Sequence, residues 1–246
     1  MNFRRMLITA AFYLPLACSA QEPSVLQLKS EPHHRLVLHN EYVNVYSVEV
    51  PPHDSVKLHK HEADAIGIVL SDSEITVHVP EKADSHQHVT KGQLRLQAAG
   101  YVHSTSINGD APYRNVTVEL LAKQESSQNL CGAVMANQPL HCPEPSATPN
   151  VGGLPQQPQF RTDKTEVALI RILPGQSVTL ETPEFPQLVV MLDEVSVGAE
   201  NSPRKLSRSG DFLWRNPEAV SQNFKNDSAV EIRLVAFAFK TGPSAK

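Results

Sequence analysis

The sequence has no long stretch in which apolar residues recur at helical spacing, and no apolar run beyond residue 20 is long enough to cross a bilayer. It also has no strong excess of one charge: 22 Lys and Arg stand against 26 Asp and Glu, a formal net charge of −4. A basic surface for nucleic acid is therefore not expected. Glycine is scarce, with 11 residues against 19 prolines. Short β-branched runs broken by turn residues predict an all-β chain.

The longest apolar run stands at the N-terminus. Residues 6–17 are almost wholly apolar, follow a short basic start and precede the small-residue exit at Cys18, Ser19 and Ala20. This order is typical of a secretory signal peptide. We therefore expect residues 1–20 to be removed and the mature protein to be periplasmic or secreted. A lipid anchor on Cys18 is the alternative, but Pro15 stands where such signals usually carry leucine.

Cleavage at that point would leave two cysteines, Cys131 and Cys142. An oxidising compartment favours a disulfide between them, and two free thiols are the alternative. Both lie in residues 122–162, a stretch rich in Pro, Ser, Asn and Gln that has the composition of a linker. Strand-like segments precede it in residues 25–121 and follow it in residues 163–241. The sequence thus predicts two domains joined by a linker with a disulfide loop.

The two strand-rich parts resemble each other, which indicates an internal duplication. The matching segments are 48–58 with 170–180, 66–70 with 188–192, and 100–102 with 210–212. All 11 histidines lie at or before His141. In this alignment His59 falls on Glu181 and His103 on Leu213. We therefore expect one metal-binding domain beside a copy that lacks metal ligands.

Three histidines of the first part form a candidate metal site. His59 and His61 are two residues apart, so on a strand both side chains point to the same face. His103 follows a turn marked by Gly100 and can approach them from a neighbouring strand. Three neutral imidazoles leave coordination positions open, as catalytic metal sites do. They suit one divalent transition metal, and Fe, Mn, Zn, Cu and Ni all stay open.

These residues carry a resemblance to the cupin superfamily. Pro52, His59 and His61, followed by an apolar strand, look like the first cupin motif. Gly92, Gly100, His103 and Asn108 are similar to the second. The resemblance implies two tandem double-stranded β-barrels (jelly rolls). It implies that residues 25–121 are a metal-binding cupin domain and that residues 163–241 are a degenerate one.

The chain departs from the cupin pattern at the fourth ligand. The family usually supplies a Glu four or five residues after the second His, where this chain has Ala65 and Ile66. Asp64 lies one residue too early and could ligate only through a β-bulge, because strand alternation turns it outward. Three readings follow: a site of three histidines, one of three histidines and Asp64, or no metal.

The other histidines are expected at the surface. His86 and His88 form a second His-x-His pattern, but their polar neighbours predict a solvated loop. His33 and His34 are predicted to be exposed near the mature N-terminus. Tyr101, beside His103, is a candidate pocket residue.

Cupins include enzymes, binding domains and storage proteins, so the resemblance leaves several functions open. The first is a metal-dependent, oxygenase- or isomerase-like enzyme acting on a small molecule. The second is a non-catalytic module that binds or senses a small molecule or sugar and whose metal is structural. The third is a structural protein with a vestigial site. A homodimer is compatible with all of them.

Overall fold

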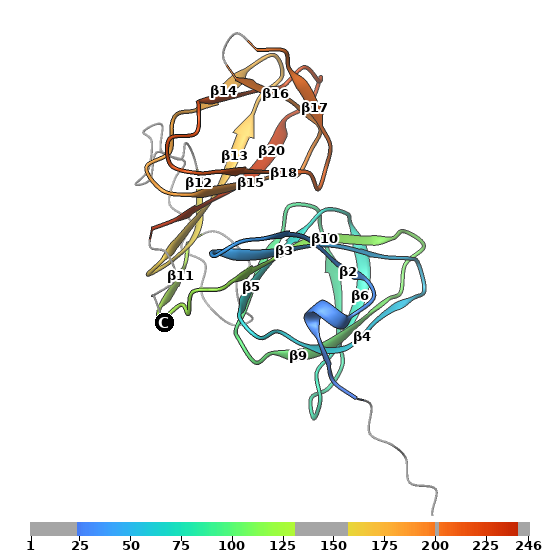
Figure 1. Cartoon of the computed structure of the whole chain (residues 1–246). Coiled ribbons are helices and arrows are strands. Elements are labelled where there is room, and N and C mark those ends of the chain that lie inside the picture. Colours follow the sequence, from blue (N-terminus) through green and yellow to red (C-terminus); the bar gives the residue numbers. More distant parts are fainter. Residues whose placement is uncertain (1–23, 131–156, 200–201, 241–246) are drawn as a thin grey trace, which may run out of the picture.

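The computed structural model describes residues 24–130, 157–199 and 202–240, which are built almost wholly of strands (Figure 1). A short 3-10 turn, η1 (Leu28–Ser30), is the exception. The all-β prediction is confirmed. No helix within these ranges is both long and apolar enough to span a membrane. The predicted signal peptide and both Cys131 and Cys142 lie outside the described residues, so the cleavage and the disulfide stay predictions.

The first barrel consists of two five-stranded sheets that face each other. One sheet runs in the order β1 (Leu26–Gln27), β4 (Ser55–Lys60), β9 (Val102–Ile107), β6 (Ser73–His78) and β7 (Ser85–Val89). The other runs in the order β2 (His34–His39), β3 (Val43–Val50), β10 (Tyr113–Leu120), β5 (Asp64–Val69) and β8 (Leu94–Gln97).

The second barrel pairs a six-stranded sheet with a four-stranded one. The six strands, in order, are β11 (Ser127–Asn129), β12 (Gln157–Thr162), β13 (Thr165–Ile172), β20 (Ile232–Phe239), β15 (Gln187–Met191) and β18 (Phe212–Arg215). The four are β14 (Ser177–Leu180), β19 (Gln222–Lys225), β16 (Val195–Ala199) and β17 (Lys205–Ser207). The two ends of the stretch predicted as a linker thus form β11 and β12, which pair with each other.

Apart from β1 and β11, the strand orders of the two barrels correspond. The order β2-β3-β10-β5-β8 of the first barrel is repeated as β12-β13-β20-β15-β18 in the second. In the same way β4-β9-β6-β7 is repeated as β14-β19-β16-β17. The duplication inferred from the sequence therefore holds at the level of topology, and the barrels are two tandem jelly rolls.

One block of the sequence alignment was wrong. Gly210 has a φ of 92° and its amide donates to the Met191 carbonyl, as the amide of Gly92, with a φ of 95°, donates to the Val69 carbonyl. Gly210 therefore corresponds to Gly92 and not to Gly100. Gly92 and Gly100 both have a positive φ, a conformation that glycine adopts without strain. The sequence alone therefore does not show which of them corresponds to Gly210.

The same correction moves the counterpart of His103. Val56 pairs with Thr105 in the first barrel, and its equivalent Val178 pairs with Phe224 in the second. Counting back two residues along each strand places Gln222, and not Leu213, at the position of His103. The expectation that the second barrel lacks an imidazole there is unaffected.

Three apolar layers form the core. One fills the first barrel, one fills the second, and the largest lies between the two facing sheets. The buried residues of the middle layer are Val43, Val45, Ile66, Ile68, Leu70, Leu94, Leu96, Val116, Val118, Leu120, Phe160, Val167, Leu169, Leu188, Val190, Leu192, Val235, Phe237 and Phe239. Figure 1 shows the two barrels stacked, with these sheets in contact.

A charged cluster joins the barrels at the edge of the middle layer. Asp193 of the second barrel lies 2.5 Å from the Lys91 ammonium of the first and 3.2 Å from the Arg233 guanidinium. Arg233 also donates to the Lys91 carbonyl at 3.2 Å. Burial raises the pKa of the Asp193 carboxyl, but the hydrogen bonds from Lys91 and Arg233 outweigh it and hold that pKa below its usual value. The carboxylate is therefore charged and bridges the two barrels.

Candidate metal centre

The three predicted histidines meet inside the first barrel. His59 lies in β4, His61 directly follows that strand, and His103 lies opposite His59 in β9. All three are buried, with 1%, 2% and 9% of the residue exposed, respectively. One nitrogen from each ring lies within 4.8 Å of the other two. The side-chain alternation expected from the sequence thus holds, and the cluster could hold a metal ion.

Backbone hydrogen bonds hold the ends of the two strands together at this point. The His61 amide donates to the Tyr101 carbonyl at 3.0 Å, and the Gly100 amide donates to the His61 carbonyl at 2.7 Å. Gly100 has a φ of 86°, which a side chain would strain. The turn that brings His103 toward His59 and His61 therefore depends on this glycine.

The nitrogen positions fit a shared ion. His61 Nε2 lies 3.1 Å from His103 Nε2. Two nitrogens bound to one ion at about 2.1 Å would be about 3.0–3.4 Å apart for tetrahedral to octahedral angles. The same two atoms share one hydrogen bond when no ion lies between them. His59 Nδ1 donates to the Lys57 carbonyl at 2.8 Å, which leaves Nε2 as the nitrogen that can ligate. That His59 Nε2 is buried and has no hydrogen-bond partner.

Burial also keeps the three rings neutral. Desolvation of the charged form lowers the pKa of His59 to about 4 and that of His61 to about 3, and it lowers the pKa of His103 well below its usual value. A metal ion binds the neutral imidazole, so near neutral pH these rings need lose no proton to bind one.

Asp64 does not join the cluster. Its carboxylate accepts hydrogen bonds from the Ala99 amide at 2.9 Å and from the Gln124 amide at 3.4 Å. The group of ligand atoms within 4.8 Å comprises only His59, His61 and His103 among the described residues. Glu62, the other nearby acid, pairs with Lys60 at 3.5 Å, with 57% of its side chain exposed. The geometry therefore favours the hypothesis of a metal site made of the three histidines without Asp64.

The three imidazoles open onto a cavity of about 90 Å³ inside the first barrel. The cavity is large enough for a few water molecules or a small molecule. Its polar lining, besides the three histidines, consists of His34, Gln87, Arg95, Gln97, Tyr101, Thr105, Tyr113, Asn115 and Thr117. The prediction that Tyr101 lines the pocket is confirmed, and its ring centre lies 4.7 Å from that of His103.

Arg95 gives the cavity a positive charge. Because Leu94 and Leu96 pack in the layer between the barrels, strand alternation turns Arg95 inward. It is the one Lys or Arg among the described lining residues, and these include no Asp or Glu. Its guanidinium donates to Gln87 Oε1 at 2.6 Å. The cavity therefore suits a small molecule that carries a negative charge.

Two predictions about other histidines were wrong. His34 is buried, with 9% exposed, and its ring centre lies 4.9 Å from that of His59. His33 lies in the turn before β2 and His34 is the first residue of that strand, so only the register of the strand could show that His34 turns inward. His86 and His88 lie in β7, which pairs with β6, and not in a loop. Both are exposed, as expected, and the signal missed was their alternation around Gln87, which faces the cavity.

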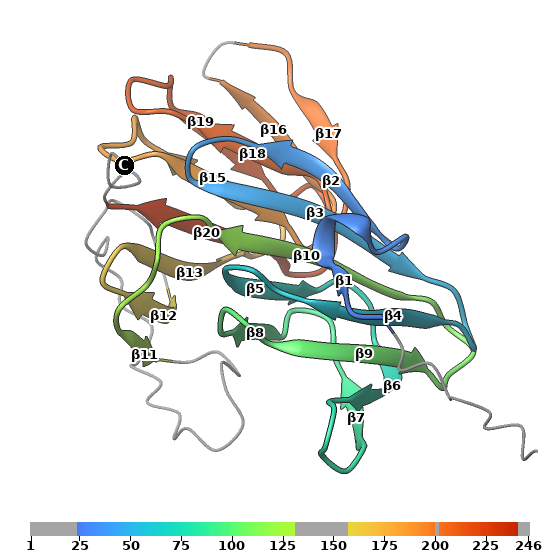
Figure 2. The same cartoon turned by 60° about the horizontal axis from the view of Figure 1, so that its bottom comes forward.

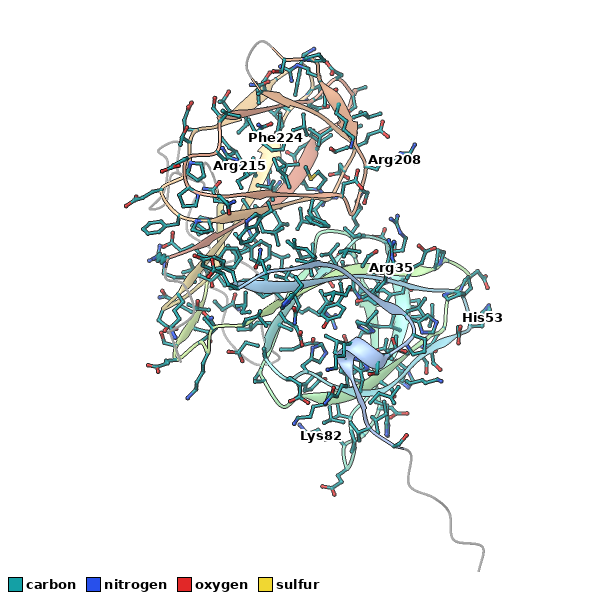
Figure 3. All side chains as sticks on the ribbon, viewed as in Figure 1. Arg35, His53, Lys82, Arg208, Arg215 and Phe224 are labelled. Atoms are coloured by element: carbon teal, nitrogen blue, oxygen red, sulfur yellow. The ribbon has the colours of Figure 1, made fainter. Side chains whose placement is uncertain are left out.

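The second barrel has filled the equivalent space. Phe224, at the position of Thr105, is fully buried. Arg215, also buried, donates to Gln187 Oε1 and to the carbonyls of Leu180 and Glu181. Figure 3 labels Phe224 and Arg215 within this barrel. An aromatic ring and a fixed guanidinium thus stand where the first barrel has its cavity and histidines, and the described part of the second barrel has no ligand cluster.

Comparison with known proteins rests on structure alone. No family model matches the sequence, and no curated protein is similar enough to count as a match. Solved structures do match. AerE from Microcystis aeruginosa is 16% identical, with a TM-score of 0.54 over 85% of this chain and 98% of that one. Salicylate 1,2-dioxygenase from Pseudaminobacter salicylatoxidans is 9% identical, with a TM-score of 0.51 over 81% of this chain and 71% of that one.

A variant of that dioxygenase in complex with gentisate is 12% identical, with a TM-score of 0.52 over 84% of this chain and 74% of the other. At these identities the likeness concerns the fold. The match covers both barrels, which agrees with the paired topology. This chain therefore has the fold of two tandem cupin-type β-barrels.

Proposed function

We propose that this protein is an exported, metal-dependent enzyme that acts on a small anionic molecule in the cavity of its first barrel, with oxygenase- or isomerase-like chemistry. One observation carries the proposal. His59, His61 and His103 are buried, stay neutral and open onto a cavity that also contains Arg95. A site that only stabilised the fold would not need that cavity.

A divalent ion bound by the three imidazoles would supply a Lewis acid with open coordination positions. Fe, Mn, Zn, Cu and Ni all remain candidates, because the three ligands suit each of them. The neighbouring dioxygenase acts on salicylate by its name. That agrees with a small carboxylate as the substrate class for this chain.

The chain's own residues would bind and orient that molecule. Arg95 offers a guanidinium, which binds a carboxylate through two parallel hydrogen bonds. Tyr101 places an aromatic ring beside His103, and Gln87 holds the Arg95 guanidinium in position. Both sheets of the barrel surround the cavity, so charges within it are screened less than they would be in water.

A non-catalytic binding or sensing role is the second candidate. The observation that favours it is the lack of any Asp or Glu among the described residues that line the cavity. An enzyme of this type commonly needs a proton acceptor beside its metal. In this case the metal would hold the ligand or stabilise the barrel, and no product would form.

Metal analysis of the exported protein, purified without chelator or nickel resin, tests the proposal. We expect about one equivalent of a divalent transition metal per chain, lost in the His59→Ala/His103→Ala variant. His86→Ala/His88→Ala is the matched control, because it removes two exposed histidines and leaves the cluster intact. A native protein that neither contains metal nor takes it up from solution would refute the metalloenzyme proposal.

Activity is tested with small carboxylates, in air and without oxygen. Turnover that stops in Arg95→Gln while the metal is retained supports the enzyme. Tight binding of a carboxylate without any product supports the binding module. Mass spectrometry of the mature protein tests export, since cleavage before Gln21 fixes the mass of the product.

A further inference from the structure

A buried carboxylate lies at the N-terminal edge of the first barrel. Glu31 is 2% exposed and follows the 3-10 turn η1. Its oxygens accept hydrogen bonds from the His33 amide at 2.8 Å and from the Lys57 amide at 3.2 Å. His34 Nδ1 lies 2.7 Å from one of them. Glu31 thus joins the N-terminal segment to β4, the strand that carries His59.

His34 extends this contact into the cavity. Its ring centre lies 4.9 Å from that of His59 and 6.3 Å from that of Tyr46. The residue is one of those that line the cavity. Because Nδ1 is engaged by Glu31, Nε2 is the ring nitrogen left for the cavity. In the tautomer that carries its proton on Nδ1, Nε2 accepts hydrogen bonds.

His34 is not one of the metal ligands. The group of nitrogens within 4.8 Å of one another contains His59, His61 and His103 but not His34, although His34 is a described residue. His34 therefore lies beside the candidate ligands, and the buried carboxylate of Glu31 fixes the orientation of its ring. Active sites use the same device when a third group orients a base.

We propose that His34 is a binding residue of the first-barrel site, which accepts a hydrogen bond from a protic group of the molecule bound at the metal, and that Glu31 positions it. This rests on the proposed metal site. It adds a substrate class: a small molecule with a hydroxyl, hydroxamate or similar group beside its metal-binding atom. Arg95 would bind the anionic part of the same molecule.

The test uses the full mature chain loaded with Co²⁺, whose visible absorption reports on bound ligands. Two probes are titrated: acetohydroxamic acid, a protic chelator, and azide, which has no proton to donate. We expect His34→Phe to weaken binding of acetohydroxamic acid about tenfold, the effect of one lost hydrogen bond. Azide binding should change less than twofold, and the cobalt content should be unchanged.

Three further variants complete the design. His34→Gln keeps an acceptor and should recover part of the loss. Glu31→Gln should also weaken binding of acetohydroxamic acid, but by less than His34→Phe does. His33→Phe is the matched control: His33 also contacts Glu31, at 3.3 Å, but it is not among the cavity-lining residues. It should bind both probes as the unaltered protein does.

The outcomes separate the two proposals. If His34→Phe weakens both probes equally, or neither, the role of His34 is overturned while the metal site stands. If the unaltered protein binds no cobalt, the proposed function fails and the role of His34 fails with it. Thermal unfolding of each variant shows whether a loss of binding comes from a loss of folded protein.

Discussion

At the residue scale, burial distinguishes the two His-x-His patterns of the first barrel. His59 and His86 each belong to a His-x-His pattern, and the sequence around each is polar. His59 is 1% exposed and its pKa falls to about 4, whereas His86 lies on the exposed face of β7 beside Thr76. The chemical difference between the two patterns therefore comes from the sheet into which each is folded: the first is buried beside a cavity, and the second is exposed.

Metal binding should stabilise the folded chain. A ligand that binds only the folded state at 100 times its Kd adds about 2.7 kcal/mol to the free energy of unfolding. We expect the thermal midpoint to rise when Zn²⁺ or Mn²⁺ is added to chelator-treated protein, as measured by differential scanning fluorimetry. The midpoint of His59→Ala/His103→Ala should not respond; an equal rise in that variant would locate the binding elsewhere.

Glu31 should make stability depend on acid pH. Burial raises the pKa of its carboxyl, but the bonds from His34 and the Lys57 amide outweigh this and bring it to about 2. Because the folded pKa lies below the unfolded one, its stabilisation is complete above about pH 4.5 and is lost as pH falls toward 2. Glu31→Gln should lower the free energy of unfolding by about 1–3 kcal/mol at neutral pH.

Urea unfolding at several pH values measures this effect. The difference in the free energy of unfolding between the unaltered protein and Glu31→Gln should become smaller as the pH falls from 4.5 to 2. Asp84→Asn is a suitable control, since Asp84 pairs with His78 at the surface and 53% of its side chain is exposed. A gap that stays constant over this range would show that the charge of Glu31 does not contribute.

At the scale of elements, the strands between the barrels explain the apolar runs of the sequence. In β10 the outward residues Val116, Val118 and Leu120 pack in the middle layer, while Asn115 and Thr117 face the cavity. In β20 both faces are apolar, because one faces the second core and the other the first barrel. A strand buried on both sides loses the alternation of polar and apolar residues.

A large-to-small change in β20 should therefore be costly. Phe237 is fully buried in the middle layer. Phe237→Ala should lower the free energy of unfolding by about 3–5 kcal/mol, the lost burial plus the cavity that remains. Val220→Ala, at a position that is 63% exposed, should change it by less than about 0.5 kcal/mol. Chemical denaturation of both variants provides the comparison, and similar values would contradict the shared core.

Strand β7, which pairs with β6 in a hairpin, is the element that the sequence analysis missed. Its exposed polar residues obscured the strand pattern, and Figure 2 shows the hairpin projecting from the first barrel away from the second. Only the inward side of β7 serves the cavity, through Gln87. An edge strand with one side in water has few apolar residues, so its composition resembles that of a loop.

At the scale of the whole molecule, the two barrels share one apolar layer and behave as one packed body. The degenerate second barrel therefore contributes to the first even without ligands, because it covers the outer face of the sheet β2-β3-β10-β5-β8. That sheet would otherwise expose a wide apolar surface to water. The second barrel thus has a packing role without a ligand cluster among its described residues.

The bridge at Asp193 should strengthen this contact. Asp193→Asn removes the charge that pairs with Lys91 and Arg233 in a partly buried setting, where 18% of the Asp193 side chain is exposed. We expect a loss of about 1–3 kcal/mol in the free energy of unfolding. Because the pKa of Asp193 lies below its usual value, the contribution is present near neutral pH and is lost in acid.

Asp227→Asn is the matched control for this prediction. Asp227 pairs with Lys225 within the second barrel, and 50% of its side chain is exposed. Exposed pairs contribute little to stability, because water and salt screen them. Guanidinium or urea unfolding, together with limited proteolysis between the barrels, distinguishes the two variants. Equal stability of both would show that the bridge adds nothing to the barrel contact.

Local patterns in the sequence determined the strand-rich halves, the duplication and the three ligands. His59 and His61 were identifiable because alternation along one strand is a property of adjacent residues. Gly100 marked the turn before His103, because the preference of glycine for turns is also a local property. The kind of ligand atom that the cluster offers, three imidazole nitrogens, followed from residue type. The all-β class followed from composition and turn residues, since these act over a few residues.

Only the tertiary structure decided what depends on distant segments. Asp64 bonds to amides 35 and 60 residues further along the chain, which keeps its carboxylate from the cluster. His34 turns inward because Glu31 and Lys57 fix the register of the N-terminal segment against β4. Arg95 faces the cavity because the second barrel buries its neighbours. Each result rests on contacts between distant strands, and such contacts form only when the barrels close.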